Sequence, residues 1–449
     1  MAGPFQNIEL DGGQMAALYL LRYDEEGRLR SPQAEREVKD QLAAVTDVYL
    51  FAHGWNNVFA QALDRYHGFA TGYIAQGTQF GIPRPAGSTP LLVGIIWPST
   101  SFVMPWEGGP VIAGAPDPDG REAAEQEEML GLVTESLSAD DDESFVSAID
   151  GQTSVDPVTA RRLAEIVLNS LRTGPDPDDA SPPPDPGELL KAWAALRGGN
   201  VPGPTPGTTF GTIGSGPSSG APAAAALSFD PRDLLRIASV WKMKARAGAV
   251  GTHGVGPLVE HILRESGVRL HLIGHSFGAR VVLSALTASS AERKAHAMLL
   301  LQPAVNRWCF APRIENTGRS GGYRTVPAKL ERPLLTTFSA HDEPLTRFFH
   351  LAMRGSQLGE PLTAAVGNTH LYGALGGYGP AGLDGDAVVQ DAIVPGAASY
   401  PLDGSARVIA VNGTVNVTVG GTPVPAIGGH SDISNPVTWW ALHDLTRPD

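Results

Sequence analysis

The chain has 449 residues, of which 42% are hydrophobic and 18% are charged, which fits one large α/β domain with insertions and a sizeable core. Its formal net charge of −14 argues against nucleic acid or an anionic membrane as an electrostatically bound partner. Cys309 is the only cysteine, so the sequence excludes an intrachain disulfide and a thiolate metal cluster, and a buried, inert thiol is expected.

The first segments predict the edge and the centre of a sheet. Residues 5–10 and 15–23 are apolar and are joined by a DGG turn, a strong hairpin signal that places an antiparallel pair at the sheet edge. The charged stretch at residues 33–44 has helical character. Residues 48–52 then form a continuous apolar run, the pattern of a strand buried on both faces of a mostly parallel sheet.

The alternation of strand and helix continues to residue 99. The strand at 48–52 ends in HGWNN, a helix is predicted over residues 59–74, and the apolar run at 91–96 predicts a further strand that ends in WPS. A cluster of large apolar side chains follows, which fits an acyl pocket and the core equally well: Phe102, Val103, Met104 and Trp106.

The composition changes between about residues 105 and 230. Pieces with helical spacing (121–138, 158–172 and 187–197) alternate with acidic, Pro/Asp-rich and Pro/Gly-rich stretches (140–143, 175–186 and 201–226). We therefore expect residues 1–116 to form the first part of a core, residues 117–230 an inserted cap or lid that is partly disordered, and residues 231–449 the second part of the core. A solvated spacer is the alternative for the insertion.

The second part of the chain returns to regular elements. Helices are predicted over residues 234–244, 257–265 and 436–445, and strands over 297–301, 334–338, 407–411 and 415–419. Strands that alternate with helices over this length predict an α/β fold with a mostly parallel central sheet and helices on both faces.

The most informative stretch is VRLHLIGHSFGARVVLSALT, residues 268–287. It predicts a buried strand, a tight turn and a helix, with Ser276 at the apex of the GHSFG motif, which is the arrangement of a nucleophile elbow. The same G-x-S-x-G pattern occurs at residues 216–220 and 318–322, but the first match has no strand before it and the second has no helix after it. The context therefore selects Ser276.

A serine nucleophile needs a histidine base and a carboxylate that orients the histidine, and in an open α/β sheet both should follow later strands. Asp342 comes directly after the strand predicted at 334–338 and is the favoured acid, with a helix cap as its alternative role. Glu343 is its nearest rival, and Asp384 and Asp386, in a glycine-rich loop, are weaker candidates.

Six histidines follow Ser276. His430 lies in a loop between the last β segment and the last helix, where a base borne by a loop is expected, and we favour it over His370. The remaining four fit the role less well because they precede a strand, adjoin the acid or lie in a predicted helix: His296, His341, His350 and His443.

Attack on a carbonyl also requires donors for the oxyanion. The Phe277 N–H begins the helix after the nucleophile and is one candidate donor. The second is expected from the loop after an earlier strand, where Trp55 would donate its N–H and Gly54 would allow close approach. His53 and His275 are expected to have structural roles.

Three motifs together, FAHGWNN, IIWPS and LIGHSFGA, resemble the α/β-hydrolase superfamily of serine hydrolases, over about residues 40–105 and 231–449. The resemblance implies a mostly parallel sheet of about eight strands, a Ser276–Asp342–His430 triad, and an oxyanion hole made by the amides of Phe277 and Trp55. The insertion departs from many members, in which the cap follows a strand later than the elbow.

The expected function is hydrolysis of carboxylic esters through an acyl-serine intermediate, with no cofactor or metal and with a small-molecule or lipid ester as substrate. Alternatives are an interfacial phospholipase or lipase with the insertion as lid, and a non-catalytic binding protein with the same fold. No apolar run reaches the roughly 18 residues that span a bilayer, and the amino terminus lacks a classical secretory signal, so a cytoplasmic location is expected.

Overall fold

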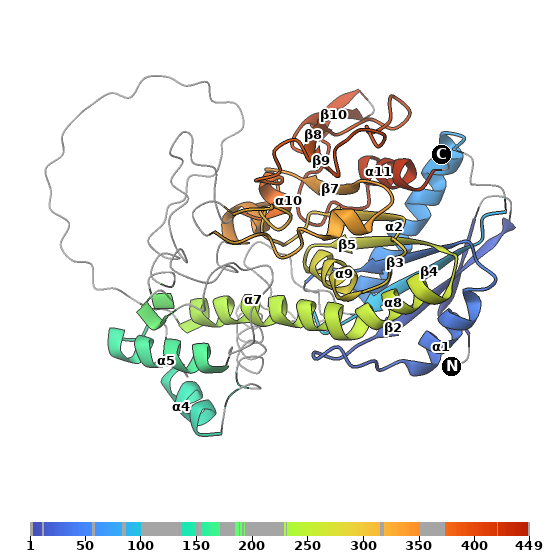
Figure 1. Cartoon of the computed structure of the whole chain (residues 1–449). Coiled ribbons are helices and arrows are strands. Elements are labelled where there is room, and N and C mark those ends of the chain that lie inside the picture. The colour runs from blue at the N-terminus through green and yellow to red at the C-terminus, as the bar shows by residue number, and fades with distance from the viewer. Residues whose placement is uncertain are drawn as a thin grey trace, which may run out of the picture.

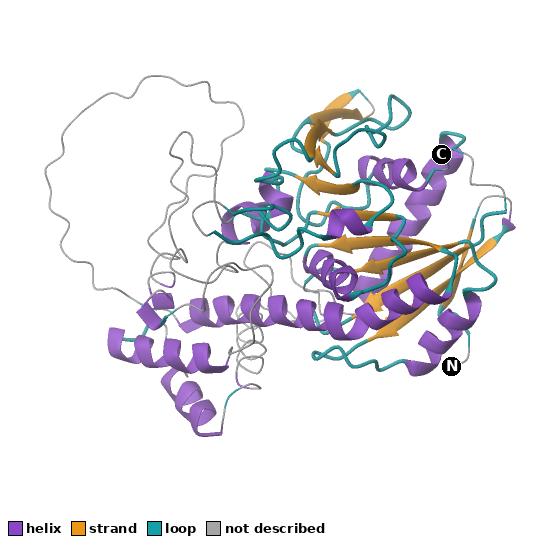
Figure 2. Cartoon of the chain, in the orientation of Figure 1, coloured by secondary structure: helices purple, strands orange, loops and turns teal. Residues whose placement is uncertain are grey.

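The computed structural model describes residues 3–10, 13–55, 59–82, 87–99, 139–149, 154–170, 231–314, 318–349, 373–419 and 421–447, with isolated positions between 134 and 229. These residues form an α/β fold in which helices cover both faces of one central sheet (Figures 1 and 2). The predicted fold class, a mostly parallel sheet between helices, is confirmed at this level.

The central sheet has nine strands in the described residues, in the order β1-β2-β4-β3-β5-β6-β7-β9-β8. Only β1 is antiparallel to its neighbour, and every other adjacent pair is parallel. The strands are β1 (Gln6–Glu9), β2 (Met15–Arg22), β3 (Asp47–Ala52), β4 (Pro90–Ile96), β5 (Arg269–His275), β6 (Ala297–Leu301), β7 (Leu334–Phe338), β8 (Ala387–Asp391) and β9 (Val408–Asn412).

The predicted amino-terminal hairpin is confirmed, since β1 and β2 pair at one edge. At the other edge, β8 was not predicted and gives the sheet nine strands where the resemblance implied about eight. Its exposed valines and its polar carboxyl end do not form the apolar run that marks a buried strand. The predicted strand at 415–419 forms β10 (Asn416–Val419), which pairs only with β11 (Thr422–Pro425) in a separate hairpin.

Two helical layers bury the sheet. On one face lie α2 (Phe59–Gln79) and α11 (Pro436–Thr446), and on the other α1 (Pro32–Gln41), α7 (Pro231–Ala249), α8 (Gly256–Glu265) and α9 (Phe277–Ala288). Alternate strand residues serve the two cores: Leu272 faces the α9 layer, and Ile273 faces the α2 layer. Short helical segments complete the described chain: η3 (Val326–Lys329), η4 (Pro344–Phe348) and α10 (Leu375–Tyr378).

Helices α7 and α8 are joined by a π-helical segment, η2 (Val250–Val255), so that residues 231–265 are helical without a break (Figure 1). The sequence predicts two separate helices here, because the glycine-rich run between them is typical of a loop. The structure uses a glycine for packing instead: a Cβ on Gly251 would lie 2.4 Å from the carbonyl oxygen of Val281 in α9. Close contact with the helix that follows Ser276 therefore replaces the expected break.

The described part of the insertion between β4 and β5 is helical. Helix α4 (Ala139–Ile149) and helix α5 (Pro157–Ser170) pack together, and α5 contacts α7, which extends away from the sheet toward them (Figure 1). The acidic run at 140–143, expected between helical pieces, forms the first turn of α4. Carboxylates in a first turn interact favourably with the helix dipole, which explains the difference. The stretch at 201–226 lies outside the described residues, as does most of the helix predicted at 121–138.

None of the described helices is long and apolar enough to cross a lipid bilayer. Cys309 is buried, as expected.

Candidate active site

Ser276 lies at the junction of β5 and α9 with φ 54° and ψ −125°, and it is 3% exposed. A non-glycine residue with positive φ is uncommon and marks backbone strain. The junction is held by hydrogen bonds: the Ser276 N–H donates to the Leu301 carbonyl in β6, and the Ser276 carbonyl accepts from Ala304. Hydrogen bonds to the end of β6 and to the loop after it thus hold the serine in this conformation.

Glycines beside Ser276 allow strand and helix to cross. A Cβ on Gly278 would lie 2.1 Å from the Ala52 carbonyl oxygen, and one on Gly274 would lie 2.6 Å from the Ala279 Cα. Both distances are shorter than nonbonded atoms tolerate, so only glycine fits at either position. The sequence predicts this strand–turn–helix geometry, and the structure has it.

Three predicted residues from different parts of the chain meet at the carboxyl edge of the sheet. His430 Nε2 lies 2.8 Å from Ser276 Oγ, and His430 Nδ1 lies 2.9 Å from Asp342 Oδ2. The His430 side chain is 13% exposed, and the Asp342 side chain is fully buried. Because the carboxylate can only accept, Nδ1 carries the ring proton of the neutral histidine and Nε2 is left to accept the serine proton.

The two carboxylate oxygens of Asp342 have different partners. Its Oδ1 accepts a hydrogen bond from the Leu345 N–H (3.0 Å), which is the contact of a helix cap, at the start of η4. Its Oδ2 is the oxygen that faces His430. The cap fixes the rotation of the carboxylate and thereby aims the other oxygen at the imidazole.

Gln302 is a second partner of this carboxylate that the sequence did not indicate. Its Nε2 donates to Asp342 Oδ2 over 3.3 Å, and its Oε1 accepts from the Thr337 hydroxyl over 2.6 Å. Gln302 is fully buried and has φ 44°, the other positive-φ non-glycine residue among the described positions. Its place directly after β6 puts it between the elbow and the acid, a position that depends on the order of the strands in the sheet and that the local sequence does not signal.

The loop after β3 lies directly against the nucleophile. A Cβ on Gly54 would be 2.6 Å from the Ser276 Cβ, so a glycine is required for this approach. The Trp55 ring packs against the Phe277 ring, with 6.1 Å between centroids. Phe277 opens α9, where the first N–H groups have no acceptor within the helix. The structure thus places Gly54 against Ser276 and Trp55 beside Phe277, the residue that follows Ser276.

His53 holds the loop after β3 in place through hydrogen bonds and a ring stack. Its Nδ1 donates to the Gly54 carbonyl (2.9 Å), its ring stacks on Trp97, and the Trp97 indole N–H donates to the His53 carbonyl. The His53 N–H in turn donates to the Tyr66 hydroxyl. Burial lowers the pKa of His53 to about 4, so the ring is neutral near pH 7. These contacts agree with the expected structural role.

His275 connects the elbow to the loop that carries the base. Its Nε2 donates to the His430 carbonyl (2.9 Å), and the two rings lie 5.0 Å apart. Burial, with the neighbouring His430, lowers the pKa of His275 well below its usual range, so the ring stays uncharged beside the site. His275 therefore holds the His430 backbone in place.

The rival candidates lie elsewhere. Glu343, Asp384 and Asp386 are exposed, and His370 and His350 lie outside the described residues, as do the apolar residues at 102–106. The other three histidines bond to groups away from Ser276: His296 to Glu331, His341 to the Thr414 carbonyl, and His443 to the Tyr73 carbonyl. Within the described chain, no group of three or more His, Cys, Asp or Glu is arranged to hold a metal ion.

Compared with family models, with curated proteins and with solved structures, the chain gives no match. The site is therefore interpreted from its own geometry.

Proposed function

We propose that this chain is a serine hydrolase of the α/β-hydrolase type that cleaves carboxylic esters through an acyl-serine intermediate. The observation that carries the proposal is the continuous hydrogen-bond chain from Ser276 Oγ through His430 to the buried Asp342 carboxylate. A nucleophile, a base with its acceptor nitrogen toward the nucleophile, and an acid that orients the base are the parts that this chemistry requires.

In acylation, His430 Nε2 takes the proton from Ser276 Oγ as the oxygen bonds to the ester carbonyl carbon. The carbonyl oxygen becomes an oxyanion, for which the N–H groups of Phe277 and Trp55 are the proposed donors. His430 then returns the proton to the leaving-group oxygen as the carbon–oxygen bond breaks, so that an alcohol departs and the acyl group stays on Ser276.

Deacylation repeats these steps with water in place of the serine. His430 takes one proton of the water as its oxygen attacks the acyl carbon, and then protonates Ser276 Oγ as the bond to the serine breaks. Asp342 stays ionised throughout and stabilises the imidazolium that forms twice in the cycle. Because its carboxylate is fully buried, solvent does not screen this interaction.

Labelling with a fluorophosphonate, followed by mass spectrometry, tests the nucleophile. We expect one label on Ser276 and none on Ser276→Ala, together with a loss of p-nitrophenyl ester hydrolysis of about a thousandfold or more. Ser320→Ala is the matched control, because Ser320 lies in another G-x-S-x-G pattern at residues 318–322 and should be irrelevant.

Absence of labelling in the native protein, or equal labelling of Ser276→Ala, would refute the proposed hydrolase and favour a binding protein with an inactive site. A series of p-nitrophenyl esters with increasing acyl length, measured on the active protein, would then identify the acyl group that it prefers.

A further inference from the structure

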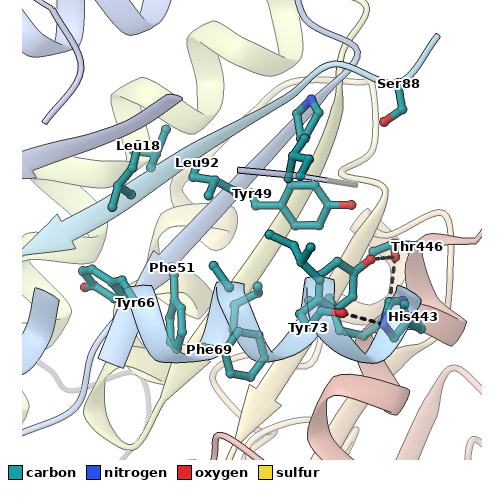
Figure 3. Close-up of a pocket in the computed structure, with 18 of the residues that line it drawn as sticks. Leu18, Tyr49, Phe51, Tyr66, Phe69, Tyr73, Ser88, Leu92, His443 and Thr446 are labelled. Carbon is teal, nitrogen blue, oxygen red and sulfur yellow. Dashed lines mark hydrogen bonds between the residues drawn. The ribbon is translucent and has the colours of Figure 1, made fainter. Parts of the chain in front are cut away.

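A cavity lies away from Ser276, between helix α2 and the sheet (Figure 3). It has a volume of about 110 Å³ and is lined mainly by aromatic and aliphatic side chains of α2, β3, β4 and α11. Tyr49 and Leu92 contribute to its wall near the amino ends of their strands, whereas Ser276 follows the carboxyl end of β5. The cavity and the serine site therefore share no catalytic residue.

The packing of α2 explains why this space stays open. Near its start, α2 is pressed onto the sheet, because a Cβ on Gly94 would lie 2.6 Å from the Tyr66 ring. Further along, α2 packs sideways against α11: a Cβ on Gly72 would lie 1.9 Å from the Trp439 ring, and one on Gly77 would lie 3.1 Å from His443. Between these contacts, α2 does not pack directly against the strands, and the cavity remains.

Residues that should be buried at this place are partly exposed instead. Tyr49 lies on β3, which has strands on both sides in the sheet, yet its side chain is only half-buried. Leu92 on β4 and Tyr73 on α2 are half-buried as well. A layered fold normally covers such positions completely, so the cavity leaves apolar surface uncovered in the interior.

One end of the cavity is polar, as Figure 3 shows, with Tyr49, Tyr73 and Thr446 gathered there. The Tyr73 hydroxyl and Thr446 Oγ1 are 2.9 Å apart. Burial, together with the nearby negative charge of Asp47, raises the pKa of both tyrosines, so their hydroxyls keep their protons. Because Thr446 Oγ1 donates to the Leu442 carbonyl over 2.8 Å, the Tyr73 hydroxyl donates to Thr446, and its oxygen can still accept a hydrogen bond from a ligand hydroxyl.

The charged groups near the cavity are already paired. Asp47, next to the tyrosines, forms an ion pair with Arg269 over 2.9 Å. Arg447, which also lines the cavity, is paired with Asp444 over 3.3 Å, so its charge is already balanced. An uncharged occupant is therefore favoured.

We propose that this cavity is a binding site for an uncharged molecule with one aromatic ring and one hydroxyl group, of the size of phenol. The ring would lie against the aromatic and aliphatic wall beside Ala70, and the hydroxyl would hydrogen-bond to the Tyr49, Tyr73 and Thr446 group. A dry cavity of roughly 150 Å³ in another protein accommodates benzene, so a somewhat smaller space limits the ligand to a single ring.

Saturation-transfer NMR with the full chain, using phenol and benzene as probes, tests this site. We expect saturation transfer to phenol, and weaker transfer to benzene, because only phenol can donate a further hydrogen bond to the Tyr73 oxygen. Ala70→Phe should fill the cavity and abolish the transfer, and Ala75→Phe, at an exposed position on the same helix, should leave it unchanged. Tyr73→Phe should reduce the preference for phenol over benzene.

Two results would overturn the proposal. One is the absence of saturation transfer from the native protein to phenol, which decides the question even if Ala70→Phe fails to fold. The other is equal transfer in folded Ala70→Phe and Ala75→Phe, which would place the ligand elsewhere on the molecule.

Discussion

Replacement of Gln302 by leucine would test whether this residue helps to position the acid. The substitution keeps the approximate volume but removes the amide that donates to Asp342 Oδ2 and accepts from the Thr337 hydroxyl. A buried hydroxyl without its acceptor costs about 1–3 kcal/mol, so we expect the free energy of unfolding to fall by that amount. The substitution also removes one long hydrogen bond to Asp342, which is worth about 1 kcal/mol. If the transition state is less well stabilised by this amount, kcat should fall about fivefold.

The pH profile of kcat/KM separates positioning from a purely structural effect. Loss of the Gln302 amide changes the hydrogen bonding of the carboxylate oxygen that faces His430, so the acidic limb of ester hydrolysis should shift relative to that of the native protein. Gln76→Leu is the matched control, because Gln76 is a buried amide that bonds to the Pro436 carbonyl (2.9 Å) at the start of α11 and not to Ser276, His430 or Asp342.

Both variants should lose stability, as measured by urea unfolding, and only Gln302→Leu should alter kcat and the pH profile. If the two variants behaved alike in the ester assay, the positioning role of Gln302 would be refuted.

Two further predictions concern stability. Gly278→Ala should destabilise the protein by about 3 kcal/mol or more, because its Cβ would lie 2.1 Å from the Ala52 carbonyl oxygen. The control is Gly267→Ala, whose Cβ would have no atom within 4 Å and which should change stability by less than about 0.5 kcal/mol. Similar melting temperatures for the two variants would contradict the packing argument. Burial lowers the pKa of both His53 and His271 to about 4, from an ordinary value near 6.5. The folded state thus binds fewer protons than the unfolded state between these values, so stability should be fully present above about pH 6.5 and fall toward pH 4, by up to roughly 1.4 kcal/mol per pH unit for each histidine. Equal urea midpoints at pH 6.5 and 4.5 would count against this.

The parts of the fold that follow from local pattern were predictable. The continuous apolar run at 48–52 became β3, and the largely apolar run before Ser276 became β5, since a strand buried on both faces needs mostly apolar residues. Ser276 and Asp342 could be predicted to lie close together for a related reason: each follows a strand of the central sheet, and the carboxyl ends of parallel strands meet at one edge. His430 follows the separate hairpin of β10 and β11, and its prediction rested on the expected chain order of nucleophile, acid and base.

Other features depend on contacts that the sequence does not reveal. Gln302 and Asp342 are 40 positions apart, and nothing in the local sequence of Gln302 distinguishes it from any other loop glutamine. The glycine-rich run that became η2 has the composition of a loop, and only the proximity of α9 makes a helix with small residues favourable there. Strand β8 gains its order from pairing with β9 and not from its own composition.

The uninterrupted helix from 231 to 265 also bears on how the chain can be cut. A single hydrophobic cluster extends from the sheet along α7 to Phe145 in α4 and Leu163 in α5. Leu234 and Trp241 of α7 belong to it and are fully buried. A shortened protein that keeps α7 but lacks α4 and α5 would expose part of this apolar surface, so a soluble core would also need polar replacements along α7.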